Sequence, residues 1–182
     1  MMIDLSKKLV LFDRDGVLNE DRREHVRAPE ELLLFDGALA ALADLTRAGI
    51  RIGICTNQSG IERGYFDEAM LTQIHQYLCA RAATFGARID RIVFCASADN
   101  AHPWRKPNAG MLLDQARYFA VDLKGVPFVG DNIIDVQAAR AAGAQPVLVK
   151  TGKGCLVAKE YAQELSDVLV YDDVQTAIKD WL

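Results

Sequence analysis

Two carboxylates stand two residues apart directly after a short apolar run near the start of the chain. The run Leu9–Phe12 is followed by Asp13 and Asp15, and Gly16 comes next. Four apolar residues bounded by a charge and a turn former are typical of a buried parallel strand. Because open α/β sheets bind ligands beyond the carboxyl ends of their strands, Asp13 is placed for chemistry. A solvated Asp-x-Asp-Gly turn would have the same sequence, so the motif alone does not decide between the two interpretations.

Three further polar residues follow other predicted strands. Thr56 comes directly after one, Asp131 comes one residue beyond another, and Lys106 lies in the loop that follows a third. Pro107 favours an extended backbone at Lys106, which keeps this lysine in the loop before the next helix. In a parallel sheet these three residues share one edge with Asp13, and we expect them to meet in one cleft.

Carboxylates gathered beside one lysine repel one another unless a cation lies among them. Hard oxygen ligands with few imidazoles favour Mg²⁺. A metal, a lysine and backbone donors suit phosphoryl transfer, where the main task is to stabilise charge on the transferring oxygens. Asp13 as nucleophile would form an aspartyl-phosphate. Asp15 is close enough to protonate the leaving alkoxide and then to take a proton from the attacking water.

Strands and helices alternate along the whole chain. The predicted strands are residues 9–12, 50–55, 92–95, 126–129, 146–149 and 168–171. The predicted helices are one opened by Asp36 and Gly37, one capped by Asp67, one capped by Asn108, and residues 136–142 and 174–182. This alternation predicts an α/β fold with a doubly wound, Rossmann-like parallel sheet.

Length and composition predict a single domain over residues 1–182, because a chain with 51% hydrophobic residues can build one sizeable core. A net charge of -4 argues against a nucleic-acid partner. The amino end is too weakly apolar for a secretory signal, and no membrane partner is expected. The four cysteines are widely spaced, which fits reduced thiols and a cytoplasmic location.

Polar loops beside the predicted strand ends offer ligands for a substrate. Charges in the loop 19–29 are more often solvated, but their position over the strand end keeps a binding role open. The arginines exceed what one phosphate requires, so a second anionic group on the substrate is expected. The candidate substrate-binding residues are Asp21, Arg22, Arg23, Asn57, Gln58, Ser59, Arg63, Arg105 and Asn132.

Four segments resemble, in order, the four motifs of the haloacid dehalogenase superfamily of phosphatases: Asp13–Asn19, Thr56–Gly60, Arg105–Pro107 and Gly130–Asp135. The match extends from Leu9 to about Gly154. The resemblance implies Asp13 as nucleophile and Asp15 as acid and base. It also implies that Thr56 and Lys106 bind the phosphoryl group.

The same resemblance implies a set of Mg²⁺ ligands. They are Asp13, the main-chain carbonyl of Asp15, and Asp131, while Asp135 is implied to order the water shell of the metal. The connections after the first and third predicted strands are too short for a separate cap domain. Specificity is therefore expected to come from loops.

The longer strings Thr56–Gly64 and Arg105–Met111 look like the branch of this superfamily that acts on heptose 1,7-bisphosphate or on histidinol phosphate. That branch usually carries a zinc loop with four ligands, but Ser97 and Trp104 stand at two of those positions, and Cys95 is the one cysteine that remains. We therefore expect no zinc. The loss of this loop bears on the substrate, because it flanks the substrate pocket in the branch.

The expected substrate is a small phosphorylated metabolite, with the 7-phosphate of a heptose 1,7-bisphosphate favoured and histidinol phosphate as the alternative. A protein of another class, the phospho-accepting receiver domain of signalling systems, also gathers acidic residues, a threonine and a lysine at a sheet edge. Its acceptor follows the third strand, where this chain has Cys95.

Overall fold

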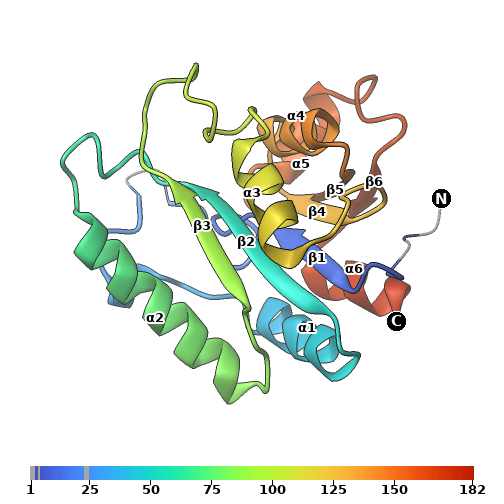
Figure 1. The fold of residues 1–182 in the computed structure, drawn as a ribbon, viewed down its shortest axis with the longest axis horizontal. Helices are drawn as coiled ribbons and strands as arrows, with labels where there is room; N and C mark the ends of the chain where they lie inside the picture. The colour runs from blue at the N-terminus through green and yellow to red at the C-terminus, as the bar shows by residue number, and fades with distance from the viewer. Residues whose placement is uncertain (1–2, 4, 23–24) are drawn as a thin grey trace.

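A six-stranded parallel sheet lies at the centre of the structure, a computed structural model that describes residues 3, 5–22 and 25–182 (Figure 1). The strands lie in the order β3-β2-β1-β4-β5-β6. Their bounds are β1 Leu9–Phe12, β2 Arg51–Asn57, β3 Arg91–Cys95, β4 Pro127–Gly130, β5 Gln145–Val149 and β6 Leu169–Tyr171. The predicted doubly wound, Rossmann-like sheet is thereby confirmed.

The strand order reverses at β1, which pairs with β2 on one side and with β4 on the other. Phe12 is in register with Ile54 of β2 and with Val129 of β4. The carboxyl ends of β1 and β4 therefore lie side by side at the point where the chain switches direction across the sheet. Doubly wound sheets bind their ligands in the crevice beyond this point.

Helices cover both faces of the sheet (Figure 1). Val10 and Phe12 face a core that contains the apolar sides of α1, α2 and α6, whereas Leu9 and Leu11 face a second core built with α3 and α4. Because both faces are covered, every residue of β1 is buried, which explains its continuous apolar run. The helices are α1 Asp36–Arg47, α2 Glu68–Thr84, α3 Gly110–Phe119, α4 Ile133–Ala142, α5 Gly154–Glu160 and α6 Val174–Trp181, with a short 3-10 helix at Pro29–Glu31.

Two elements extend two or more residues beyond their predicted ends. Strand β2 continues through Thr56 and Asn57, which are in register with residues of β3. Helix α4 begins at Ile133, three residues before the predicted start. There the side chain of Asn132 accepts from the main chain of Ile134, while Asp135 accepts from the Asn132 N–H, so the two side chains form a capping box.

Two local predictions were wrong. Asn108 does not cap α3, because its side-chain amide donates to the carbonyls of Asn100 and His102 instead, and the helix begins at Gly110. Helix α5 was not predicted. It buries little beyond Val157, so its seven residues show no helical apolar repeat.

No helix among the described residues is both long and apolar enough to cross a membrane.

The core between the sheet and helix α1 generates a stability prediction. Leu42 of α1 is fully buried, and its replacement by alanine leaves a cavity. We expect Leu42→Ala to lower the free energy of unfolding by about 2–5 kcal/mol. The matched control is Leu156→Ala in α5, where the leucine is 69% exposed and the change should stay within about 0.5 kcal/mol. Urea denaturation followed by circular dichroism measures both, and equal losses would contradict this account of the core.

Candidate active site

A cavity of about 430 Å³ opens beyond the carboxyl ends of the central strands. Its lining is rich in charged and amide side chains, as expected for a site that binds a polar ligand. The lining residues are Asp13, Asp15, Asp21, Arg22, His25, Val26, Thr56, Asn57, Gln58, Ser59, Arg105, Lys106, Asp131, Asn132, Ile134 and Lys153. The four catalytic residues predicted from the sequence are all among them.

Asp13 and Lys106 form the centre of this site. Asp13 directly follows β1, and its main-chain N–H donates to the carbonyl of Val129 in β4. The Lys106 ammonium lies 2.8 Å from Oδ1 of Asp13 and 2.8 Å from Oδ1 of Asp135. Burial disfavours the charge on Lys106, but the two carboxylates outweigh it and raise the pKa of the lysine above its ordinary value. Lys106 is therefore charged at neutral pH.

Asn57 at the end of β2 holds the main chain of Lys106. Its side-chain amide donates to the Lys106 carbonyl at 3.1 Å and accepts from the Lys106 N–H at 3.1 Å. This pair of hydrogen bonds resembles the pairing of two strands and ties the loop before α3 to the sheet. Asn57 therefore has a structural role, and the substrate-binding role predicted for it stays a prediction.

Asp131 follows β4 and lies close to two glycines. A Cβ atom at either Gly16 or Gly152 would overlap the Asp131 carboxylate, and both glycines have positive φ, at 80° and 55°. The main-chain N–H of Lys153 donates to Oδ2 of Asp131 at 2.7 Å. Two loops that follow different strands therefore approach this carboxylate with their backbones, which requires glycine.

Three buried carboxylates surround one candidate cation position. Oxygens of Asp13, Asp131 and Asp135 all lie within 4.8 Å of one another. Burial, opposed by Lys106 and reinforced by Asp135, raises the pKa of Asp13 to about 7. Burial together with the charges of Asp135 and Asp13 raises the pKa of Asp131 to about 8. Three carboxylates facing one ammonium leave an excess of negative charge on hard oxygen ligands, and Mg²⁺ fits this set.

Asp15 has a different environment from the other carboxylates. Its oxygens accept from the guanidinium of Arg14, from Asn19 at 3.0 Å and from Gln58 at 2.8 Å. Burial alone would raise its pKa, but the charge of Arg14 and these hydrogen bonds outweigh burial and lower the pKa of Asp15. The side chain lines the cavity and is 25% exposed, so it can reach a ligand there.

Gln58 connects the second motif to Asp15. Its amide nitrogen lies 2.8 Å from Oδ2 of Asp15 and 2.8 Å from the hydroxyl of Thr56. Thr56 and Gln58 are both 1% exposed. The hydroxyl of Thr56 accepts this bond, so its own proton can be donated to an anion in the cavity.

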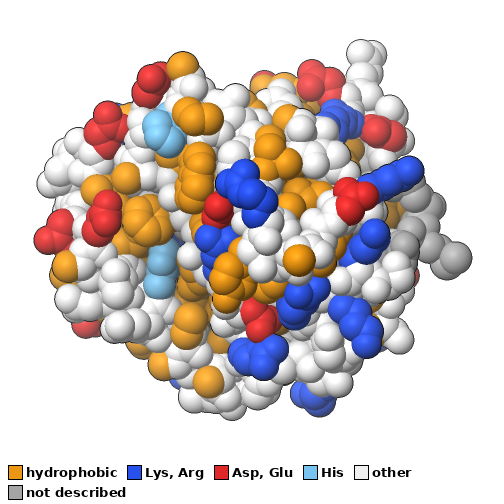
Figure 2. All heavy atoms as spheres, in the orientation of Figure 1, with side chains coloured by type: hydrophobic (Ala, Val, Ile, Leu, Met, Phe, Trp, Pro, Cys, Tyr) orange, Lys and Arg blue, Asp and Glu red, His pale blue; other side chains and the backbone are white. Residues whose placement is uncertain are grey.

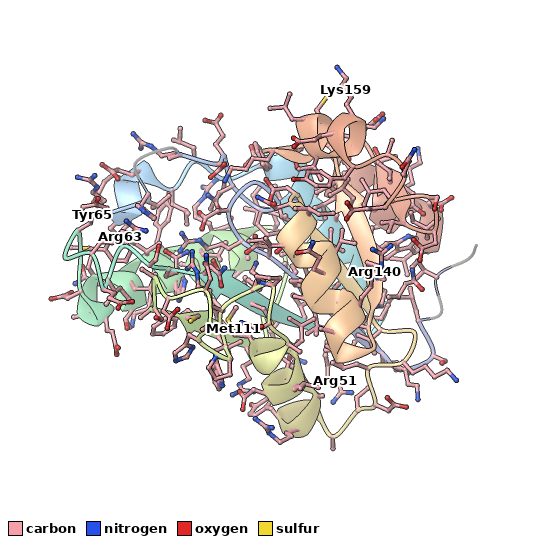
Figure 3. All side chains as sticks on the ribbon, turned by 90° about the horizontal axis from the view of Figure 1, so that it is seen from above. Arg51, Arg63, Tyr65, Met111, Arg140 and Lys159 are labelled. Atoms are coloured by element: carbon pink, nitrogen blue, oxygen red, sulfur yellow. The ribbon has the colours of Figure 1, made fainter. Side chains whose placement is uncertain are left out.

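The predicted substrate-binding residues fall into three groups. Asp21, Arg22, Asn57, Gln58, Ser59, Arg105 and Asn132 line the cavity. Arg63 is exposed and is not among the lining residues, and Figure 3 shows it beside Tyr65 at the edge of the molecule. Arg23 lies outside the described residues.

Sequence reasoning missed two cations of the site. Lys153 lines the cavity, and its ammonium pairs with Asp21 at 3.2 Å, which joins two loops across the rim. Arg14 is fully buried, although it stands between two aspartates in a motif where a charged residue usually faces solvent. The glycines on either side of Lys153 were the one local sign of a close backbone approach.

The loop between β3 and α3 brings Cys95 and His102 together, with Sγ 3.5 Å from Nδ1. Within the described part of the chain, the one group of three or more potential metal ligands is the set of aspartates given above. The expectation that the protein binds no zinc stays a prediction.

A family model and curated relatives of known function match this chain. The HAD-hydrolase-like family model matches residues 103–177. The D-glycero-beta-D-manno-heptose-1,7-bisphosphate 7-phosphatase of Pseudomonas aeruginosa is 40% identical over 171 residues, which cover 93% of this chain and 95% of that enzyme. The enzyme with the same name from Bordetella bronchiseptica is 45% identical over 148 residues, which cover 81% of this chain and 83% of its own.

Solved structures agree with these relatives. The crystal structure of the D,D-heptose 1,7-bisphosphate phosphatase from B. bronchiseptica, complexed with magnesium and phosphate, superimposes with a TM-score of 0.88 at 40% identity. The superposition covers 94% of this chain and 96% of that one. The corresponding phosphatase from Burkholderia thailandensis gives a TM-score of 0.74 at 37% identity and covers 95% of this chain and 97% of its own.

The crowded carboxylates generate a prediction about pH and divalent cations. Without a cation, the pKa values of Asp13 and Asp131, about 7 and 8, lie above the ordinary value of 3.8. At these two groups the folded state then binds more protons than the unfolded state. Their contribution to stability is therefore fully present below pH 3.8 and is lost as pH rises to about 8. In EDTA, we expect a lower Tm at about pH 8 than at about pH 5.5. Mg²⁺ should raise the Tm most at the higher pH.

Differential scanning calorimetry tests this prediction with two variants. Asp131→Asn removes one carboxylate of the cluster and should weaken both the pH dependence and the response to Mg²⁺. Asp114→Asn changes a carboxylate that pairs with Arg91 and Arg117 outside the cavity, and it should keep both. A wild-type response to Mg²⁺ in Asp131→Asn would contradict the assignment of this cluster to the cation.

Proposed function

Because the chain belongs to the haloacid dehalogenase-like phosphatases, we propose that it hydrolyses the 7-phosphate of D-glycero-D-manno-heptose 1,7-bisphosphate. The observation that carries this proposal is that Asp13, Lys106 and Asp131 lie close together in the lining of a cavity that Asp15 also lines. The high identity to heptose bisphosphate phosphatases over nearly the whole chain supports the choice of substrate.

The first step is the attack of an Asp13 carboxylate oxygen on the phosphorus atom. The bond from phosphorus to the sugar oxygen breaks, and the phosphoryl group passes to Asp13 as an acyl phosphate. Oδ1 of Asp13 pairs with the Lys106 ammonium at 2.8 Å and accepts from the main-chain N–H of Arg14, so these contacts orient the carboxylate. In this proposal, Lys106 and the hydroxyl of Thr56 bind the oxygens of the transferring group.

Asp15 moves the protons. In its protonated form it gives a proton to the leaving sugar oxygen, and in its ionised form it takes a proton from the water that attacks the acyl phosphate. This second reaction releases inorganic phosphate, regenerates the Asp13 carboxylate and returns the proton to Asp15 for the next turnover. The contacts that lower the pKa of Asp15 favour the second role.

Asp13 and Asp131 are the side chains proposed to hold Mg²⁺, with the main-chain carbonyl of Asp15 as a further ligand. The bound ion would supply positive charge that draws the anionic phosphoryl group toward the anionic nucleophile. Asp135 lies close enough to join them, and the Lys106 ammonium pairs with one of its oxygens.

The cavity rim provides cations for a second phosphate. Arg105 donates to the Asn100 side chain at 3.0 Å and to the carbonyl of Ser97 at 2.8 Å, which uses two of its five N–H donors. Arg22 and Lys153 also line the cavity. A bisphosphate would use these groups, whereas the amine and imidazole of histidinol phosphate would not. The receiver-domain alternative has no support, because β3 ends in Cys95, where its phosphate acceptor would stand.

The proposal includes a cytoplasmic location and no nucleic-acid partner. A net charge of -4 and four free cysteines support it. On the face shown in Figure 2, the described basic side chains lie among acidic, apolar and neutral ones and form no continuous basic patch.

The nucleophile is tested by Asp13→Asn. An amide cannot attack phosphorus as a carboxylate does, and we expect kcat for a phosphate monoester to fall by about a thousandfold or more. Asp114→Asn serves as the matched control and should keep wild-type kcat. A released-phosphate assay gives the rates, and trapping of a phosphoenzyme that survives acid quenching and is cleaved by hydroxylamine identifies the acyl-phosphate intermediate. More than a few per cent of residual activity in Asp13→Asn would show that another residue is the nucleophile.

The substrate is tested by comparing kcat/KM for the heptose bisphosphate, its 7-monophosphate and histidinol phosphate. We expect the bisphosphate to be preferred. Arg105→Ala should reduce that preference about 10- to 100-fold, because it removes a charged hydrogen-bond donor. Arg63→Ala changes an arginine outside the cavity lining and should have a smaller effect. Preference for histidinol phosphate, or unchanged selectivity in Arg105→Ala, would reject this assignment.

A further inference from the structure

Arg14 is the largest fully buried side chain of the described residues, although it carries a charge. Its guanidinium donates from Nη2 to both oxygens of Asp15, at 2.8 and 2.9 Å, and from Nε to Oδ1 at 3.3 Å. A planar guanidinium that contacts both oxygens of a carboxylate fixes the plane of that carboxylate as well as its position.

His75 of α2 holds the other side of this guanidinium. Its Nε2 lies 3.3 Å from Nη1 of Arg14, and its ring lies against Phe94 with the centroids 6.3 Å apart. Burial and the charge of Arg14 lower the pKa of His75 to about 3. A neutral imidazole can accept a hydrogen bond from Arg14, so a helix far away in the sequence orients the guanidinium.

The burial of Arg14 does not by itself indicate a role in fold stability. Replacing a buried ion pair by apolar side chains of similar volume is often neutral or stabilising, so the pair is weak evidence for a structural role. Asn19 and Gln58 also bind Asp15, yet neither provides a planar two-point contact. What Arg14 adds is a fixed direction for the carboxylate that lines the cavity.

We propose that Arg14, held in turn by His75, is a positioning residue that directs the Asp15 carboxyl group toward the leaving oxygen of the substrate. This inference rests on the proposed function, because it assumes that Asp15 protonates that oxygen. It assigns to Arg14 and His75 an effect on leaving-group protonation, without contact between either residue and the phosphoryl group.

The test uses two substrates that differ in their need for an acid. The sugar alkoxide is a poor leaving group and requires protonation, whereas the phenolate of p-nitrophenyl phosphate leaves without it. For both substrates, kcat/KM reports the steps up to phosphoenzyme formation and is independent of the later hydrolysis of that intermediate. A misdirected Asp15 should therefore lower kcat/KM for the sugar phosphate and spare the aryl phosphate.

We expect Arg14→Met to lower kcat/KM for the sugar phosphate at least about tenfold more than for p-nitrophenyl phosphate, since general acids contribute about 10²–10⁴-fold. His75→Leu should lower the ratio of kcat/KM for the sugar phosphate to kcat/KM for p-nitrophenyl phosphate by a smaller factor. His75→Gln, which keeps a hydrogen-bond acceptor, should restore most of this ratio. Because His75 variants leave Arg14 in place, they provide the test even if Arg14→Met does not fold.

Two control variants are measured with the same pair of substrates. Asp15→Asn should show the largest difference between the substrates. Arg91→Met removes an arginine that pairs with Asp114 outside the cavity, and it should change neither value. Equal losses on both substrates in Arg14→Met and His75→Leu, alongside a large difference in Asp15→Asn, would overturn the positioning role and leave the proposed function standing. Equal losses in Asp15→Asn would overturn the acid role itself, and the positioning role with it.

Discussion

The Lys106 ammonium lies between the carboxylates of Asp13 and Asp135, and the rest of the site depends on this buried arrangement. Removing one member of such a group leaves an uncompensated buried charge, which is strongly destabilising. The protein therefore holds Lys106 by its main chain as well, through the paired hydrogen bonds from Asn57. The proposed nucleophile, the lysine proposed to bind phosphate and the candidate metal site are consequently not independent of one another. The charge of each one changes the electrostatic environment of the others.

The parallel sheet decides where this group can exist. Helices cover both faces, so the interiors of the strands are apolar and polar side chains are confined to the strand ends. The reversal of strand order at β1 then brings the ends of β1 and β4 together, with Asp13 beyond one and Asp131 beyond the other. Loops from the remaining strands close around that point, and glycine backbones at residues 16 and 152 allow close approach to Asp131.

The two aspartates of the first motif have opposite electrostatic environments. Asp13 is crowded by burial and by other carboxylates, which raise its pKa, whereas the Arg14 guanidinium and neutral donors lower that of Asp15. Neighbouring acids whose environments separate their pKa values can take different chemical roles. In the proposed reaction, a cation offsets the crowding at Asp13, while Asp15 exchanges protons with the leaving group and with water. A backbone separation of two residues is enough to place these carboxylates in different surroundings.

The local sequence by itself determined the order of the strands and of the α-helices other than α5, the bounds of β1 and the four ordered motifs. These features follow from apolar periodicity and from residue type at fixed short spacings. Only the tertiary structure decided that Arg14 is buried against His75, that Lys153 reaches the cavity while Arg63 lies outside its lining, and that Lys106 pairs with Asp135. Each of these features depends on contacts between residues that are distant in the chain. A local sequence pattern does not encode which side chains of a loop such contacts will bury.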